Sequence, residues 1–133
     1  ELGTWIIPMQ VSDIFGTTLY RQVYDQRIGY VDFPILPYLY NIKSQLVKNI
    51  FAKTNQKTII VELQTEPWIG TLDIANDQEK QAQLFSLSRF QNYVNFAQKT
   101  GFDTVYLWGV EWWYFMKQHG HPQYFEYAKS LFK

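Results

Sequence analysis

Apolar and β-branched residues gather in three short segments of the chain, and each segment predicts a β-strand. The first runs from Asp13 to Tyr20, the second from Thr58 to Val61 within the stretch Lys57–Trp68, and the third from Phe102 to Trp108. The middle segment is a continuous aliphatic run, which is typical of a strand buried on both faces of a parallel sheet. We therefore expect it to be the central strand.

Helices are predicted from apolar residues that recur at helical spacing. The first has Pro37 in its first turn and continues for roughly four turns to Phe51. The second follows Ser86 or Ser88, either of which can cap it, and ends at Gly101. Its apolar side carries Phe90, Tyr93, Val94, Phe96 and Ala97. A short helix from Tyr124 to Phe132 closes the chain, and residues 1–12 are expected to be an incoming loop or the end of a helix.

The remaining segments are predicted to be loops or turns. Residues 22–36 form one expected loop, and residues 64–84 form a long polar loop, which in a compact domain is usually functional or disordered. Residues 109–116 are expected to form a loop rich in aromatic residues, and a turn follows at His119–Pro122.

The predicted order of strand, helix, strand, helix, strand and helix is the signature of parallel βαβ units. Since crossovers are right-handed, the three strands point the same way and their carboxyl ends share one edge of the sheet. Tyr20 and Arg21 follow the first strand, Glu62 to Trp68 follow the second, and Trp108 to Trp113 follow the third. Binding and catalytic sites of parallel α/β folds lie at this edge, so we expect a site there.

Composition excludes several classes of protein. The chain has 133 residues, with 12 Lys and Arg against 12 Asp and Glu, so no basic surface recruits nucleic acid by charge alone. Cysteine is absent, which excludes disulfides and thiolate metal sites. No apolar run is long enough to span a membrane, and no glycine-rich nucleotide motif occurs. His119 and His121 lack a third ligand nearby, so a surface turn is favoured over a metal site, and no cofactor is predicted.

Aromatic residues make up 19% of the chain, and many Trp and Tyr residues fall in predicted loops, where aromatic side chains usually form a binding surface. Sugars offer flat C–H faces on which Trp and Tyr stack, and hydroxyl groups to which carboxylates and amides bond. Hydrolysis of a glycosidic bond uses two carboxylates, which stand about 5–5.5 Å apart in retaining enzymes. Carboxylates among aromatic residues therefore point to a carbohydrate site.

Glu62 is the leading candidate for a catalytic group. A carboxylate at the end of a buried strand costs desolvation unless it has partners, so its presence indicates a use. Tyr20 and Arg21, at the end of a neighbouring strand, would keep it ionised and oriented as a nucleophile. Trp108 would form the floor under the sugar. The alternative interpretation is structural: Glu62 caps a neighbouring helix or pairs with an arginine.

The chain resembles the C-terminal part of a (β/α)8-barrel retaining glycoside hydrolase of the clan that includes cellulases, xylanases and mannanases. It is particularly similar to bacterial cellulase-like hypothetical proteins with a sixth strand of the type Asp13-Ile-Phe-Gly-Thr-Thr-Leu-Tyr-Arg21. In that clan the nucleophile is a Glu at the end of the seventh strand, which Glu62 matches within Val61-Glu62-Leu63. The clan's usual Thr is Val61 here. Trp108 matches the tryptophan that ends the eighth strand.

The resemblance implies a fold class: a partial TIM barrel of three consecutive β-α units, strands six to eight, with residues 1–133 as the C-terminal fragment of one catalytic domain. Glu1 to Gly3 would then end the loop after the fifth strand. The implied substrate is a β-linked oligo- or polysaccharide. Trp68 and Trp112, with Trp108, would stack on sugar rings, while Gln64 and Glu111 would bond hydroxyl groups. Glu66 is either a ligand at the rim or simply exposed, and Glu111 is either a rim ligand or part of a structural ion pair.

The clan's acid/base residue is the Glu of an Asn-Glu pair after the fourth strand, and this chain contains no such pair. The isolated chain is therefore expected to be inactive, and to need the N-terminal part of the barrel or to self-associate, because unpaired strand edges associate. Two other hypotheses stay open. One is a non-catalytic carbohydrate-binding α/β module that uses the same aromatic residues, and the other is a complete three-layer α/β domain whose carboxylates are structural.

Overall fold

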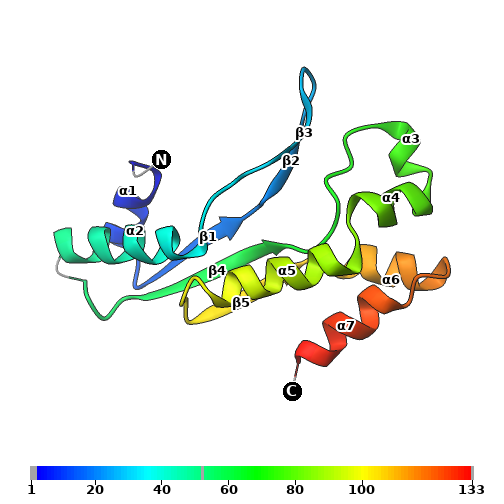
Figure 1. Cartoon of the computed structure of the whole chain (residues 1–133). Coiled ribbons are helices and arrows are strands. Elements are labelled where there is room, and N and C mark those ends of the chain that lie inside the picture. Colours follow the sequence, from blue (N-terminus) through cyan, green and yellow to red (C-terminus); the bar gives the residue numbers. More distant parts are fainter. Residues whose placement is uncertain (1–2, 52, 133) are drawn as a thin grey trace.

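A computed structural model describes residues 3–51 and 53–132, and it has a mixed α/β architecture (Figure 1). Its elements follow the order α1 (Gly3–Val11), β1 (Ile14–Leu19), β2 (Gln22–Asp25), β3 (Gly29–Asp32), α2 (Pro37–Ile50), β4 (Lys57–Gln64), α3 (Leu72–Ala75), α4 (Gln78–Leu84), α5 (Leu87–Gln98), β5 (Thr104–Trp108), α6 (Val110–Gln118) and α7 (Gln123–Leu131). Glu1 and Leu2, expected to end a loop, lie outside the described residues, and Gly3 already belongs to α1.

The three predicted strands form one parallel sheet in the order β1-β4-β5, as the alternation of strands and helices indicated. β4 is the central strand. Ser86 caps α5 by accepting a hydrogen bond from the Arg89 amide at 3.3 Å, and Gly101 follows that helix with a φ of 71°. The carboxyl ends of the strands therefore meet at one edge, as expected for parallel βαβ units.

A β-bulge in β4 sets which residues face each side of the sheet. Thr17 pairs with Ile60 but Thr18 pairs with Glu62, and the pairing with β5 skips the same position, so Val61 is one extra residue in this strand. A bulge bends a strand and redirects its side chains. Ile60 and Leu63 consequently point to the same side, and Glu62 points to the other. A Cβ on Gly16 would lie 2.5 Å from Val61 Cγ1, so only glycine fits beside the bulge.

Helices cover one side of this sheet, which we call the covered face. Leu19, Ile60 and Leu63 are fully buried there beneath α5, α6 and α7. A smaller cluster joins α1 and α2 to β1 through Trp5, Met9, Phe15 and Val47, and Phe102 contacts both clusters. The apolar residues predicted for α5 are all buried in the larger cluster.

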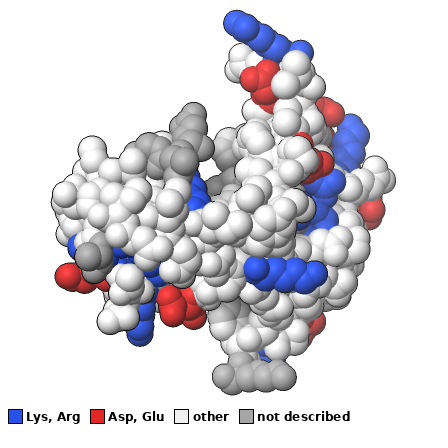
Figure 2. All heavy atoms as spheres, turned by 60° about the vertical axis from the view of Figure 1, so that its left-hand side comes forward, with Lys and Arg blue, Asp and Glu red and all other residues white. Residues whose placement is uncertain are grey.

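The other side of the sheet, which we call the open face, has no helix layer within the described residues. Ile14 is 53% exposed, Val61 40%, Tyr106 57% and Trp108 49%. The prediction that the central strand is buried on both faces is therefore wrong at Val61. Charges of both signs are scattered over the view in Figure 2, with wide uncharged areas between them. None of the helices in ranges 3–51 and 53–132 combines the length and apolar character needed to cross a membrane.

The predicted loop at residues 22–36 is instead an antiparallel hairpin, β2–β3, which stands out from the body of the molecule (Figure 1). Asp25 Oδ1 accepts hydrogen bonds from the Arg27 and Ile28 amides, at 2.8 and 3.2 Å. Gly29 then adopts a φ of 79°. A short polar turn that ends in a left-handed glycine is a regular hairpin connection, so Asp25 and Gly29 together were the missed signal.

Two other predicted loops contain helices. The segment 64–84 includes α3 and α4, and Asp77 caps α4 by accepting from the Lys80 amide at 3.0 Å. The expected aromatic loop 109–116 is mostly α6, whose buried residues Trp112, Trp113 and Met116 recur at helical spacing. Helical spacing was present in both segments, but polar composition in the first and aromatic density in the second concealed it.

Candidate functional site

A pocket of about 490 Å³ lies at the edge of the sheet where the strands end. It is lined by Tyr20, Gln64, Glu66, Pro67, Trp68, Ile69, Trp108 and Trp112. Six of these eight residues were singled out from the sequence, from segments that follow three different strands. The parallel arrangement of the sheet brings them together, and we call this hollow the strand-end pocket.

Glu62 is hydrogen bonded to the wall of this pocket. The Tyr20 hydroxyl donates to Glu62 Oε2 at 2.9 Å, across the pair of strands β1 and β4. Burial, this hydrogen bond and the charges of Glu62 and Glu66 raise the pKa of Tyr20 to about 12. The phenol therefore stays protonated at ordinary pH and remains a donor. No hydrogen bond to the second oxygen of Glu62 occurs among the described residues, so one oxygen is oriented while the other is unengaged.

Glu66 also lines this pocket, where Trp108 holds it. The Trp108 indole donates from Nε1 to Glu66 Oε1 at 3.1 Å. Burial raises the pKa of Glu66, the hydrogen bond from Trp108 opposes that rise, and the charge of Glu111 adds to it. The strand-end pocket thus combines an oriented carboxylate in Glu62 with a carboxyl group in Glu66 that holds its proton more tightly than usual.

Three contacts fix the backbone around Glu66. Both the amide and the hydroxyl of Thr65 donate to the Trp108 carbonyl, at 3.0 and 2.6 Å, and the Trp113 indole donates to the Thr65 carbonyl at 2.8 Å. Gly109 has a φ of 142°, and a Cβ there would lie 3.1 Å from Glu66 Cβ and from Thr65. The turn after β5 is therefore packed directly against the loop after β4. This packing fixes the position of Glu66 relative to Trp108.

Trp68 also lines the pocket, and its ring stands edge-on to that of Tyr20 at a centroid distance of 5.9 Å. Trp68 and Trp108 are both partly exposed, so both can present a ring face to a ligand. Pro67 and Ile69, which flank Trp68, also line the pocket and were not anticipated. They belong to a segment predicted as loop, and nothing in their residue type identified them.

Gln64, predicted to bond sugar hydroxyls, has a structural position. It is almost fully buried, and its Oε1 accepts from the amides of Arg21 and Gln22 at 3.1 and 3.0 Å. Its oxygen therefore joins the end of β4 to the start of the hairpin and is not free for a ligand.

Arg21, predicted to tune Glu62, points to the covered side of the sheet. Its guanidinium carbon lies 4.3 Å from the centre of the Phe96 ring and 5.0 Å from that of Tyr93. No ion pair between Arg21 and Glu62 occurs within ranges 3–51 and 53–132. The reason is that successive side chains along a strand point to opposite faces. Tyr20 points to the open face, so Arg21 points to the covered face.

Trp112, predicted to stack on sugar, lines the pocket but is a buried core residue. It is 6% exposed, and its Nε1 donates to Gln81 Oε1 at 2.8 Å. Glu111 is exposed, does not line the pocket and affects it through the charge that it exerts on Glu66. The helical form of residues 110–118 explains both positions, since it turns Trp112 inward and Glu111 outward.

A metal centre has no candidate ligand set among the residues that the structure describes, where no three His, Cys, Asp or Glu side chains converge. His121 Nε2 lies 3.2 Å from Glu79 Oε1, and His119 Nδ1 lies 2.8 Å from the Phe115 carbonyl. The two histidines therefore have separate partners.

Comparison of the chain with protein-family models, with curated proteins and with solved structures found no match in any of the three. The geometry of the site is therefore the basis from which a function can be inferred.

Proposed function

We propose that the chain forms strands six to eight of a (β/α)8-barrel glycoside hydrolase that cleaves β-linked oligo- or polysaccharide with retention. The observation that carries this proposal is the 2.9 Å hydrogen bond from Tyr20 to Glu62 beside a pocket walled by tryptophans. A carboxylate oriented by a phenol, next to exposed ring faces, suits attack on a sugar held by stacking.

The open face supports a barrel as the complete fold. A barrel has its interior filled by side chains from all its strands, so a segment of three strands would leave inward-facing residues uncovered. Ile14, Val61 and Tyr106 lie uncovered on the open face, and Glu62 lies on the same face near the carboxyl end. In a barrel these residues would point inward, with Glu62 near the mouth where substrates bind. A complete three-layer domain would require a second layer over this face.

In the proposed reaction, the unengaged oxygen of Glu62 attacks the anomeric carbon. A glycosyl ester forms while the bond to the leaving oxygen breaks, and an acid/base carboxyl group from another part of the protein protonates that oxygen. The same group then removes a proton from water, which attacks the ester and releases the sugar with its configuration retained. Tyr20 holds the other oxygen of Glu62 throughout.

Binding is proposed to depend on Trp108 and Trp68, whose exposed rings would stack on sugar faces. Glu66, with its raised pKa, would donate a hydrogen bond to a hydroxyl group or accept one, according to its protonation. Trp112 and Gln64 would support the pocket wall from behind.

The test is Glu62→Gln in the full-length protein, assayed on a panel of β-linked glucans, xylans and mannans. We expect turnover to fall by about 10⁴-fold or more, as for other residues that act as one catalytic unit, while saccharide binding by calorimetry persists. Incubation with an activated 2-deoxy-2-fluoro glycoside should place a covalent label on Glu62, read by peptide mass spectrometry.

The matched control is Glu126→Gln, which changes an exposed carboxylate on α7 that pairs with Lys117 at 2.9 Å. It should leave turnover unchanged. Wild-type turnover that survives Glu62→Gln would refute Glu62 as the nucleophile.

The alternative is a carbohydrate-binding module that uses the same pocket without catalysis, and the partial exposure of Trp68 and Trp108 fits it equally well. The same assay separates the two functions. A wild-type protein that binds the saccharides, hydrolyses none of them and takes up no label would favour the binding module.

A further inference from the structure

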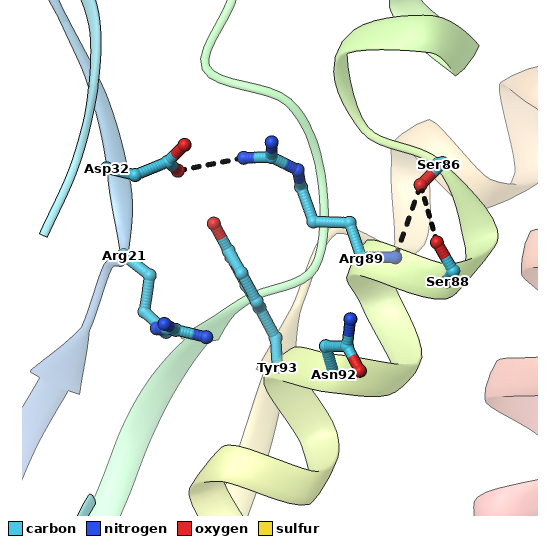
Figure 3. A pocket seen from close by; sticks show the side chains of 7 residues that line it. All are labelled: Arg21, Asp32, Ser86, Ser88, Arg89, Asn92 and Tyr93. Atoms are coloured by element: carbon cyan, nitrogen blue, oxygen red, sulfur yellow. Dashed lines mark hydrogen bonds and ion pairs between the residues drawn. The ribbon is translucent and has the colours of Figure 1, made fainter. Parts of the chain in front are cut away.

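A second hollow, of about 410 Å³, lies between the hairpin and the first two turns of α5 (Figure 3). Arg21 and Asp32 line it from the hairpin side, and Ser86, Ser88, Arg89 and Tyr93 line it from α5. Every one of these side chains carries a polar group. This hollow, which we call the hairpin pocket, is separate in its lining from the strand-end pocket, and none of its residues is needed for the reaction proposed above.

The hairpin pocket carries an excess positive charge. Arg89 pairs with Asp32 at 2.8 Å, and this ion pair forms one wall. Arg21 has no carboxylate partner within the described part of the chain, and its Nε is buried without a hydrogen-bond partner. Two guanidinium groups therefore face one carboxylate, which leaves one positive charge uncompensated.

Tyr93 presents an unused hydrogen-bonding group to the same space. The residue is only 4% exposed, and its hydroxyl has no hydrogen-bond partner. In Figure 3 the ring extends from α5 toward the hairpin, with its hydroxyl directed toward the Asp32–Arg89 pair and the Arg21 guanidinium beside the ring. Burial raises the pKa of Tyr93 and the nearby Arg89 opposes this, although no hydrogen bond joins the two. A buried hydroxyl without a partner is uncommon, and it leaves this group available to a ligand.

The start of α5 adds to this electrostatic pattern. The helix has 12 residues, and its first turn, which begins after Ser86, borders the pocket. The amide groups at a helix N-terminus attract negative charge. The hydroxyls of Ser86 and Ser88 are hydrogen bonded to each other at 3.1 Å at this end, which leaves one further donor for a ligand.

We propose that the hairpin pocket binds a small oxyanion, a phosphate, sulfate or carboxylate group, between Arg21, the Tyr93 hydroxyl and the N-terminus of α5. The Arg21 guanidinium would supply the charge and Tyr93 would donate one hydrogen bond. The Asp32–Arg89 pair would close the pocket on the hairpin side and admit only a small group. The oxyanion is either a free ion or a charged substituent of a larger molecule such as an acidic sugar.

The test is calorimetric titration of the full-length protein with inorganic phosphate at neutral pH, with ionic strength held constant by sodium chloride. We expect saturable binding at one site. Arg21→Gln should weaken it by more than about tenfold, and Tyr93→Phe by about two- to tenfold, as expected for charged and neutral hydrogen bonds. Tyr93→Phe should not lower the melting temperature without phosphate, because it removes an unpaired buried hydroxyl.

The matched control is Arg27→Gln, which removes an exposed arginine at the tip of the same hairpin and should leave the affinity unchanged. Parallel titrations with a sugar phosphate and with a uronic acid distinguish the sources of the oxyanion. If the sugar phosphate or the uronic acid binds more tightly than inorganic phosphate, the oxyanion is a charged substituent of a carbohydrate. If both bind equally well or more weakly, the free ion is supported. No saturable binding of any of the three, or equal weakening by Arg27→Gln and Arg21→Gln, overturns the proposal.

Discussion

The two faces of the β1-β4-β5 sheet are built from the same strands, yet they carry different kinds of residue. On the covered face, Leu19, Ile60 and Leu63 are completely buried beneath the helices. On the open face, Tyr106 and Trp108 are about half exposed, and Glu62 stands among them with Tyr20 as its partner. The covered face is mainly apolar, whereas the open face mixes aromatic rings with a carboxylate.

Trp113 and Trp108 show the same contrast between the covered and open sides within a single residue type. Trp113 is buried, packs against Phe90 at a centroid distance of 5.4 Å and bonds the Thr65 carbonyl. Trp108 lines the strand-end pocket and bonds Glu66. The difference indicates that stability depends mainly on the covered side and recognition mainly on the open side, a division that three substitutions can test.

Trp113→Ala should have the largest effect on stability. It removes a buried ring and leaves the Thr65 carbonyl unpaired, so the free energy of unfolding of the full-length protein should fall by about 3–5 kcal/mol. Urea unfolding followed by circular dichroism measures this. A loss below about 1 kcal/mol would mean that the covered side contributes far less than its burial suggests. Trp113→Phe should lose less than Trp113→Ala, because it keeps an aromatic ring.

Trp108→Ala should affect binding more than stability. The loss of one stacking ring should weaken saccharide affinity by about 0.5–1.5 kcal/mol, or roughly two- to tenfold, as measured by calorimetry. The control is Tyr114→Ala, which removes an exposed ring on α6 outside the pocket. Equal losses in the two variants would show that the open face has no special role in recognition.

Glu66→Gln should have the smallest effect, visible as a change in pH dependence. Burial raises the pKa of Glu66 above its ordinary value of 4.5, so the folded protein binds this proton more tightly than the unfolded chain. The resulting stability is present at low pH and is lost as the pH rises from 4.5 through the raised pKa. Glutamine, which can still accept from Trp108, should flatten that decline.

The measurement is a series of melting temperatures from pH 4 to pH 8, in which we expect a difference of about 2 °C or less, since Glu66 is partly exposed. Asp13→Asn, a change at an exposed carboxylate before β1, serves as the control and should follow the wild-type profile. If the melting temperature of Glu66→Gln changed with pH in the same way as that of the wild type, the Glu66 carboxyl group would be solvated in the folded protein.

Much of the fold could be predicted from the sequence because strong periodic signals decide it. The aliphatic run at 58–61, the helical spacing after Pro37 and the Ser86 cap all correspond to observed elements. The parallel order of the strands then brought Tyr20, Glu66, Trp68 and Trp108 into one pocket, because parallel strands end at one edge.

The errors have a common physical cause, which is that residue type alone does not fix the direction of a side chain. Arg21 was assigned to Glu62 because the two are close in the topology, but alternation along the chain turned it toward Phe96. Trp112 was assigned to the ligand because tryptophan stacks on sugars, but α6 turned it into the core. Gln64 was predicted to bond a ligand, but its side-chain oxygen accepts hydrogen bonds from two backbone amides.

The single extra residue at Val61 has a consequence for how this strand responds to changes of length. If Val61 were deleted, regular alternation would return and Leu63 would stay on the side of the helices with Glu62 on the other side. Deletion of a residue from the regular part of the strand, such as Ile59, would instead move the side chains on one side of the deletion to the opposite face. Loss of the extra residue should therefore be tolerated better than any other change of length in β4.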